Sequence, residues 1–133
     1  MLLIDVTGEH YEWTEVVGES FYRDHLATIR RLIDGDAKRM DGLPAILRLD
    51  DDNPHDANAV SVWIADGKVG HLSREDAVEF REDVELYLDD VEAVAVWAQI
   101  RGARVREDGE IEGNIGVVLK FRLPILPDEI QEI

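Results

Sequence analysis

The stretch Asn53–Leu72, NPHDANAVSVWIADGKVGHL, decides the fold because it combines a turn, two strands, a second turn and the approach to a helix. Pro54 fixes its own φ angle and disfavours a helical conformation at the residue before it. The short polar side chains of Asn53, Asp56 and Asn58 can bond to neighbouring backbone amides. We therefore predict a stiff, polar loop at the start of this stretch.

Two strands follow that loop. Residues 59–64 are rich in β-branched and aromatic side chains, which favour a strand, and residues 68–72 predict the returning strand. The pair Asp66-Gly67 between them is the strongest short signal for a two-residue hairpin turn. Such a turn predicts a positive φ angle at Gly67, which glycine adopts at no steric cost.

The residues before the loop predict three further strands. Leu2 to Val6 indicate an edge strand, and residues 11–17 alternate in a way that is typical of a strand ending at Gly18. Residues 43–49 alternate more weakly and predict a strand that enters the acidic run Asp50-Asp51-Asp52. Residues 34–42, the charged link that precedes this last strand, are predicted to form a mobile excursion.

Two helices are expected. Ser20 is a suitable N-cap for the first, which runs to about Ile33. Its apolar positions share one face: Tyr22, Leu26, Ile29 and Ile33. Ser73 caps the second helix, with acids in its first turn. Its buried stripe is predicted to be Ala77, Phe80, Val84 and either Tyr87 or Leu88, with the acids Glu79, Glu82, Asp83 and Glu85 mostly on the other faces.

The C-terminal third predicts mostly strand. Residues 91–100 alternate, residues 107–109 indicate a turn, and residues 113–123 predict a final strand closed by Pro124. The tail, residues 124–133, is either a docked arm or loose. This element order, with short links between strands, predicts a mainly β fold with two helices, closed or nearly closed into a small barrel.

Length and composition limit the possibilities. The chain of 133 residues predicts one domain spanning residues 1–133. It has no cysteine, which excludes disulfides, thiolate zinc sites and a cysteine nucleophile, and suits a reducing compartment. The N-terminus lacks the basic region of a signal peptide, and no stretch approaches the ~18 apolar residues of a spanning helix. We therefore expect a cytoplasmic protein without membrane contact.

The formal net charge of −16 opposes broad phosphate binding, although strong acidity also serves solubility. The cations are unevenly placed, however. One basic cluster falls in the first helix and the link after it: Arg23, Arg30, Arg31, Lys38 and Arg39. A second cluster precedes the turn near the C-terminus: Arg101, Arg104 and Arg106. These two clusters are candidate sites for an anionic partner.

Three motifs carry a resemblance to a known family. NPHDANAV, followed by a short hairpin and KVGHLSREDA, with VVGESFY upstream, resembles the HIRAN domain, a small module found alone in bacteria and fused to helicase-like DNA repair proteins. The resemblance covers residues 16–84, with the three motifs in order. It implies an OB-like β-barrel with two helices and a pocket for the free 3′ end of single-stranded DNA.

The resemblance also implies roles for individual residues. It assigns His55 to stacking on the terminal base and Asp56 to accepting a hydrogen bond from the terminal 3′ hydroxyl. It places Phe21 and Tyr22 against the terminal nucleotides. For each residue a structural alternative stays open: Asp56 bonding loop amides, His55 in solvent, and Phe21 in the core.

The same family places a basic residue where this chain has Ser20, so phosphate contact there is lost. It places another stacking aromatic where this chain has Arg101, whose guanidinium plane can also stack on a base. His71 and Arg74 stand at the hairpin exit and the helix start, where a phosphate can meet amide donors and positive charge. Arg74 is equally well explained as a surface residue.

Catalysis and cofactors have no candidate constellation. The acids Asp50, Asp51, Asp52 and Asp56, with His55, are metal ligands by type, but their spacing fits no metal motif. No nucleophile is paired with a base, and no glycine-rich phosphate loop occurs. We therefore predict a non-enzymatic module without metal or cofactor. Its partner is the end of a DNA single strand or, in the alternative, a protein that docks on the acidic faces and the tail.

Overall fold

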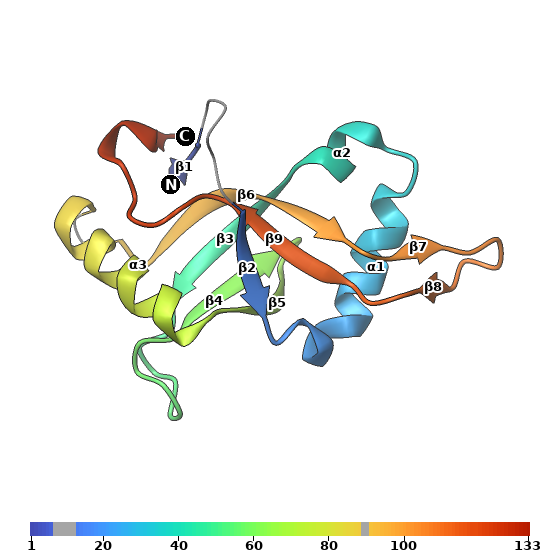
Figure 1. The fold of residues 1–133 in the computed structure, drawn as a ribbon, viewed down its shortest axis with the longest axis horizontal. Coiled ribbons are helices and arrows are strands. Elements are labelled where there is room, and N and C mark those ends of the chain that lie inside the picture. The colour runs from blue at the N-terminus through green and yellow to red at the C-terminus, as the bar shows by residue number, and fades with distance from the viewer. Residues whose placement is uncertain (7–12, 89–90) are drawn as a thin grey trace.

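The structure, a computed structural model, describes residues 1–6, 13–88 and 91–133 (Figure 1). Its strands are β1 (Leu2–Ile4), β2 (Trp13–Val17), β3 (Leu43–Leu49), β4 (Val60–Ile64), β5 (Gly67–Leu72), β6 (Ala93–Arg101), β7 (Arg104–Val105), β8 (Ile111–Glu112), β9 (Gly116–Lys120) and β10 (Ile130–Glu132). Its helices are the 3₁₀ turn η1 (Glu19–Tyr22), α1 (Arg23–Ile33), α2 (Ala37–Asp41), α3 (Arg74–Tyr87) and the 3₁₀ turn η2 (Pro127–Glu129).

Six strands close into a barrel. Their order is β6-β3-β4-β5-β2-β9, and β9 pairs back onto β6 through the register Trp97↔Lys120 to Arg101↔Gly116. Closure removes the exposed edges that an open sheet of this size would carry. The prediction of a mainly β fold built on a small OB-like barrel is confirmed.

The barrel interior is filled by alternate residues of each strand. On β3, Ala45 and Leu47 are fully buried, whereas the alternating residues Ile46 and Arg48 face outward. The helices cover the barrel at two places, with α1 and α3 lying on opposite sides of it in Figure 1. On α3, Phe80 is buried and meets Phe121 edge to face at 6.1 Å. One continuous core therefore joins helices and strands.

The two predicted helices form, with three corrections. Ser20 does not cap α1, because it lies inside η1, and α1 begins only at Arg23. The link 34–42, expected to be a mobile excursion, contains a further short helix, α2, which Asp36 caps by accepting a hydrogen bond from the Arg39 amide. Asp83 was expected outside the buried stripe, but it is buried and accepts a hydrogen bond from the Ile125 amide at 2.8 Å.

The second predicted helix, α3, otherwise agrees with the sequence prediction. Ser73 caps α3 by accepting a hydrogen bond from the Asp76 amide at 3.1 Å. Ala77, Phe80 and Val84 are buried as predicted. The last position of the stripe is Leu88, which is buried, and not Tyr87, which is exposed.

The hairpin turn is displaced by one residue from its predicted position. The two residues with positive φ are Ala65 (50°) and Asp66 (63°), and Gly67 pairs with Ile64 as the first residue of β5. Gly67 is required by space. A Cβ atom there would stand 2.2 Å from Nε2 of His25, which itself lies 2.8 Å from the Ile64 carbonyl oxygen.

The structure corrects the expectation for the N-terminus and decides between the two alternatives for the tail. β1 is not an edge strand, because it lies between β6, to which it is parallel, and β10. The tail is a docked arm: β10 forms the edge, and Ile125 and Glu129 are buried. The final strand is shorter than residues 113–123, and part of the predicted strand 11–17 lies outside the described residues.

Candidate nucleic-acid interface

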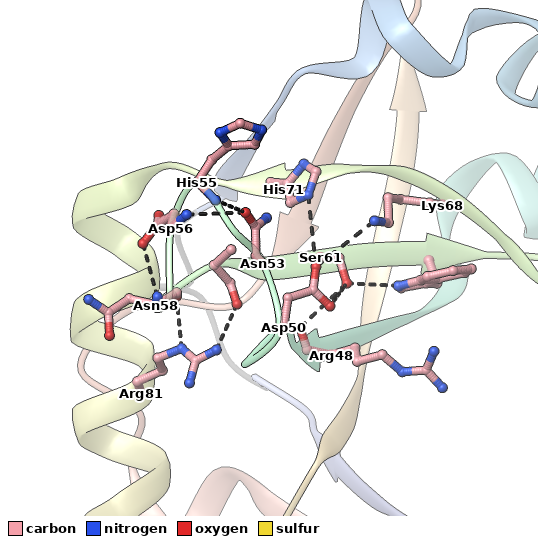
Figure 2. A network of polar contacts seen from close by, with 12 residues as sticks. Arg48, Asp50, Asn53, His55, Asp56, Asn58, Ser61, Lys68, His71 and Arg81 are labelled. Atoms are coloured by element: carbon pink, nitrogen blue, oxygen red, sulfur yellow. Dashed lines mark hydrogen bonds and ion pairs between the residues drawn. The ribbon is translucent and has the colours of Figure 1, made fainter.

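The loop between β3 and β4 holds itself in shape through its own side chains. It is closed at the base by the Asp50 amide donating to the Ala59 carbonyl at 2.9 Å. Asn53 Oδ1 accepts from the amides of His55 and Asp56, at 2.9 and 3.1 Å. Asp56 Oδ1 accepts from the Asn58 amide at 2.9 Å (Figure 2). The predicted stiff, polar loop is therefore present, and we call it the Asp50–Ala59 loop.

A residue that the sequence did not single out fastens this loop to α3. Arg81 donates from Nε to the Asn58 carbonyl and from its NH2 group to the Ala59 carbonyl, both at 2.8 Å (Figure 2). Its NH1 group lies 2.7 Å from Asp51 Oδ1. Arg81 follows the buried Phe80 by one residue on a helix rich in acids, and only that placement hinted at an inward role. These contacts hold both the first and the last part of the loop against α3.

Asp50 connects the loop to the barrel wall. Its Oδ1 accepts a hydrogen bond from the Ser61 hydroxyl at 2.9 Å, and Ser61 accepts one from the Trp63 indole at 2.8 Å. Its Oδ2 lies 3.9 Å from both Lys68 Nζ and His71 Nε2 (Figure 2). One carboxylate therefore organises side chains from two neighbouring strands, β4 and β5.

The surroundings of His71 favour its neutral form by lowering the pKa of the ring. Burial lowers the pKa of His71 from its ordinary value of 6.5, the Lys68 charge lowers it further, and Asp50 raises it in part. Because a lowered pKa moves protonation away from pH 7, His71 offers a planar ring with one donor and one acceptor. It is not a fixed counter-ion for phosphate.

Several predicted site residues lie around the Asp50–Ala59 loop. His71 pairs with Ser61 across β4 and β5, and the ring of Tyr22 lies 6.5 Å from the His71 ring. Phe21, next to Tyr22 in η1, is 86% exposed, so the core-packing alternative for it is wrong. His55 is exposed and its ring points away from the loop's hydrogen bonds in Figure 2.

Arg101 and Arg74 have different surroundings. Arg101 lies on the Trp13 ring, with its guanidinium carbon 4.6 Å from the ring centroid, and donates to Gln99. Its stacking partner is therefore a side chain of the barrel. Arg74 is exposed at the first position of α3, and no hydrogen bond or ion pair joins it to the loop within the described residues.

The basic clusters noted in the sequence serve the fold. Three arginines of α1 donate to backbone carbonyls around the β7–β8 hairpin: Arg23 to Gly113, Arg30 to Ala103 and Arg31 to Gly109. Further along, Arg104 pairs with Glu112 and Arg106 with Asp108. These five cations therefore make contacts within the fold, at or beside the β7–β8 hairpin.

Two neighbouring concavities lie on the outer side of β3, β4 and β5. One, of about 450 Å³, is lined by Pro44, Ile46, Arg48, Trp63, Ala65 and Asp66. The other, of about 400 Å³, is lined by Arg48, Lys68 and residues 49–54 of the loop. Arg48 forms a wall of both. A third, of about 570 Å³, lies beside η1 against Arg23 and residues 113–115.

Within residues 1–6, 13–88 and 91–133, no group of three or more His, Cys, Asp or Glu side chains is arranged to hold a metal ion. None of the helices in that part of the chain has the length and apolar character needed to cross a membrane. Comparison of the chain with protein-family models, curated proteins and solved structures found no match. The HIRAN resemblance therefore rests on the sequence motifs alone.

Proposed function

We propose that this protein is a non-catalytic binding module that captures the free 3′ end of single-stranded DNA beside the Asp50–Ala59 loop. The observation that carries the proposal is the meeting of a pre-organised polar loop with aromatic rings from two other segments. His71 adjoins the loop through Asp50, and Tyr22 adjoins His71. Phe21, which precedes Tyr22 in the chain, exposes its ring.

The chemistry of the loop suits a terminal hydroxyl. Asp56 Oδ1 accepts a hydrogen bond from the Asn58 amide, and an ionised carboxylate can accept further hydrogen bonds on both oxygens. The loop is held by Asn53 and Arg81, so ordering it on binding costs little. Exposed His55 and Phe21 supply planar rings, and bases stack on aromatic side chains without regard to sequence.

A second candidate function is a protein-interaction module that has lost DNA affinity. It is favoured by the use of Arg23, Arg30 and Arg31 to bind backbone carbonyls, which leaves an acidic chain with few cations for phosphate. On that reading the acidic faces and the C-terminal arm are the docking surfaces. Arg101 and Arg74 then have only local roles.

The decisive experiment compares three strands of one sequence: open with a 3′ hydroxyl, open with a 3′ phosphate, and circular. A 3′ phosphate removes the donor and sets a dianion against Asp56. Because a hydrogen bond to a charged group contributes about 1.5–3 kcal/mol, the hydroxyl end should bind about ten- to a hundredfold more tightly. Fluorescence anisotropy at low salt measures the three affinities. Equal binding of all three rules out end capture.

Asp56→Asn is the matched variant for this test. The asparagine oxygen can still accept the Asn58 amide, so the turn and the melting temperature should be retained. The negative charge is lost, so the preference for hydroxyl over phosphate ends should fall by about tenfold or more. A variant that melts earlier but keeps its end preference would show that Asp56 serves the loop only. Absence of binding by the wild type favours the interaction module.

A further inference from the structure

The outer face of β3, β4 and β5 carries an aromatic residue between two cations. Trp63 stands on β4, opposite Ile46 of β3 and Lys68 of β5. The Arg48 guanidinium carbon lies 5.2 Å and Lys68 Nζ lies 5.5 Å from the centroid of the Trp63 ring. We call these four residues the Trp63 platform. Its tryptophan is partly exposed and is not needed to fill the core.

The orientation of the indole is fixed. Its N–H donates to Ser61, and the Ser61 hydroxyl donates to Asp50 at the base of the loop. Ser61, in the middle of this network, is fully buried. A ring held in one orientation loses little entropy when another ring stacks on it.

The platform continues the proposed end-binding site. The concavity beside Trp63 and the concavity beside the loop share Arg48 as a wall, and Lys68 lines the second. Asp50 touches Lys68, His71 and, through Ser61, Trp63. Trp63 follows Ala59, the last residue of the loop, by four residues, a distance of about 13 Å in extended backbone. About four stacked nucleotides span that distance.

We propose that the Trp63 platform is a second subsite for single-stranded nucleic acid, where an interior base stacks on Trp63 as Arg48 and Lys68 move from the ring to the flanking phosphates. The proposal rests on the end-binding function proposed above and adds the path of the strand. Stacking and cation contact together select a polyanion with planar bases. The loop acids Asp50 and Asp51 are already paired, with Lys68 and Arg81. They therefore repel phosphate less than free carboxylates would.

The test is a length series of oligothymidylates of about two to about eight nucleotides, each with a 3′ hydroxyl. Wild-type affinity should rise about five- to a hundredfold as the strand grows long enough to reach Trp63, which is the range of one base–aromatic contact. Trp63→Ala should abolish that rise while keeping both the affinity for the shortest strand and the 3′-hydroxyl preference. Trp63→Phe, which keeps a ring, should retain most of the rise.

Trp97→Ala is the matched control. Trp97 is also a partly exposed outward residue, but it lines a separate concavity beside α2 with Lys38 and Lys120. It should leave the length dependence unchanged, and melting temperatures of all variants check that they are folded. An unchanged rise in Trp63→Ala overturns the platform. The platform is also overturned if Trp97→Ala abolishes the rise of affinity with strand length as Trp63→Ala does.

The two proposals fail in different ways. A clear 3′-end preference with no effect of Trp63→Ala overturns the platform and leaves end capture intact. Circular strands that bind the wild type as well as open ones, but not Trp63→Ala, overturn end capture and support the platform. If no strand binds at low salt, both are overturned.

Discussion

At Gly67, a hydrogen atom occupies the place where every other residue would put a carbon atom against the ring of His25. The sequence pattern explained this glycine by the φ angle of a turn, but the turn is made by Ala65 and Asp66, and Gly67 already belongs to β5. The His25 ring contacts the Ile64 carbonyl at the other side of the same turn. The glycine therefore serves the docking of α1 onto the hairpin.

Gly67→Ala is expected to destabilise the protein by about 1–3 kcal/mol, because the new Cβ must displace His25 and break its contact with Ile64. Urea unfolding followed by circular dichroism measures the free energy. The control is the same change in a His25→Ala background, where the space is open and the cost should be smaller. If the cost is equal in both backgrounds, backbone conformation and not the ring is the cause.

At the scale of elements, three arginines join α1 to the segment around the β7–β8 hairpin. Arg30 is the central one: its side chain is 8% exposed, and it donates to the Ala103 carbonyl at 3.1 Å and to Asp34 at 2.9 Å. Arg31 donates to the Gly109 carbonyl in the turn between β7 and β8, and Arg23 donates to the Gly113 carbonyl just after β8. A buried arginine in such a position is costly to remove, because its partners stay behind unsatisfied.

Arg30→Met keeps an unbranched apolar side chain but removes the guanidinium group and with it both hydrogen bonds. We expect a loss of about 1.5–3 kcal/mol, together with faster amide hydrogen exchange in residues 103–112. Arg39→Met is the matched control, because Arg39 is 63% exposed and 3.6 Å from Asp36 on α2. It should cost about 0.5 kcal/mol or less. Similar losses for both variants would show that Arg30 is an ordinary surface charge.

At the scale of the whole molecule, the net charge of −16 and the internal use of the α1 arginines limit any nucleic-acid binding to few phosphates. Arg48 and Lys68 are cations of the proposed path, and both already lie over Trp63. Most of the affinity must then come from stacking and from the hydrogen bonds of the strand end.

The logarithm of the DNA affinity should therefore fall with the logarithm of the salt concentration with a slope of about −1 to −3. Titrations at several salt concentrations, with strand length and end kept constant, measure this slope. Arg48→Gln should make it shallower by about one phosphate's share, or about 0.7. A slope of about −6 or steeper would mean that a broad basic surface exists, contrary to both proposals.

The sequence by itself determined the features that depend on near neighbours along the chain. The β-branched runs predicted β4 and β5, Ser73 predicted the start of α3, and Asn53, Asp56 and Asn58 predicted the self-bonded loop. Each depends on contacts within about four residues, and local spacing encodes such contacts directly. The closed barrel followed from the order of strands and the shortness of their links.

Only the tertiary structure decided where the long side chains go. Arg30 and Ala103 are 73 residues apart, Arg31 and Gly109 are 78 apart, and Arg81 reaches Asn58 across 23. In the sequence the α1 arginines were candidates for phosphate, Arg101 was a candidate for stacking on a base, and the tail was either a docked arm or loose. Which partner such a flexible cation finds depends on which backbone carbonyls and rings the closed barrel brings within reach. The periodicity of apolar residues along the chain does not encode these long-range contacts.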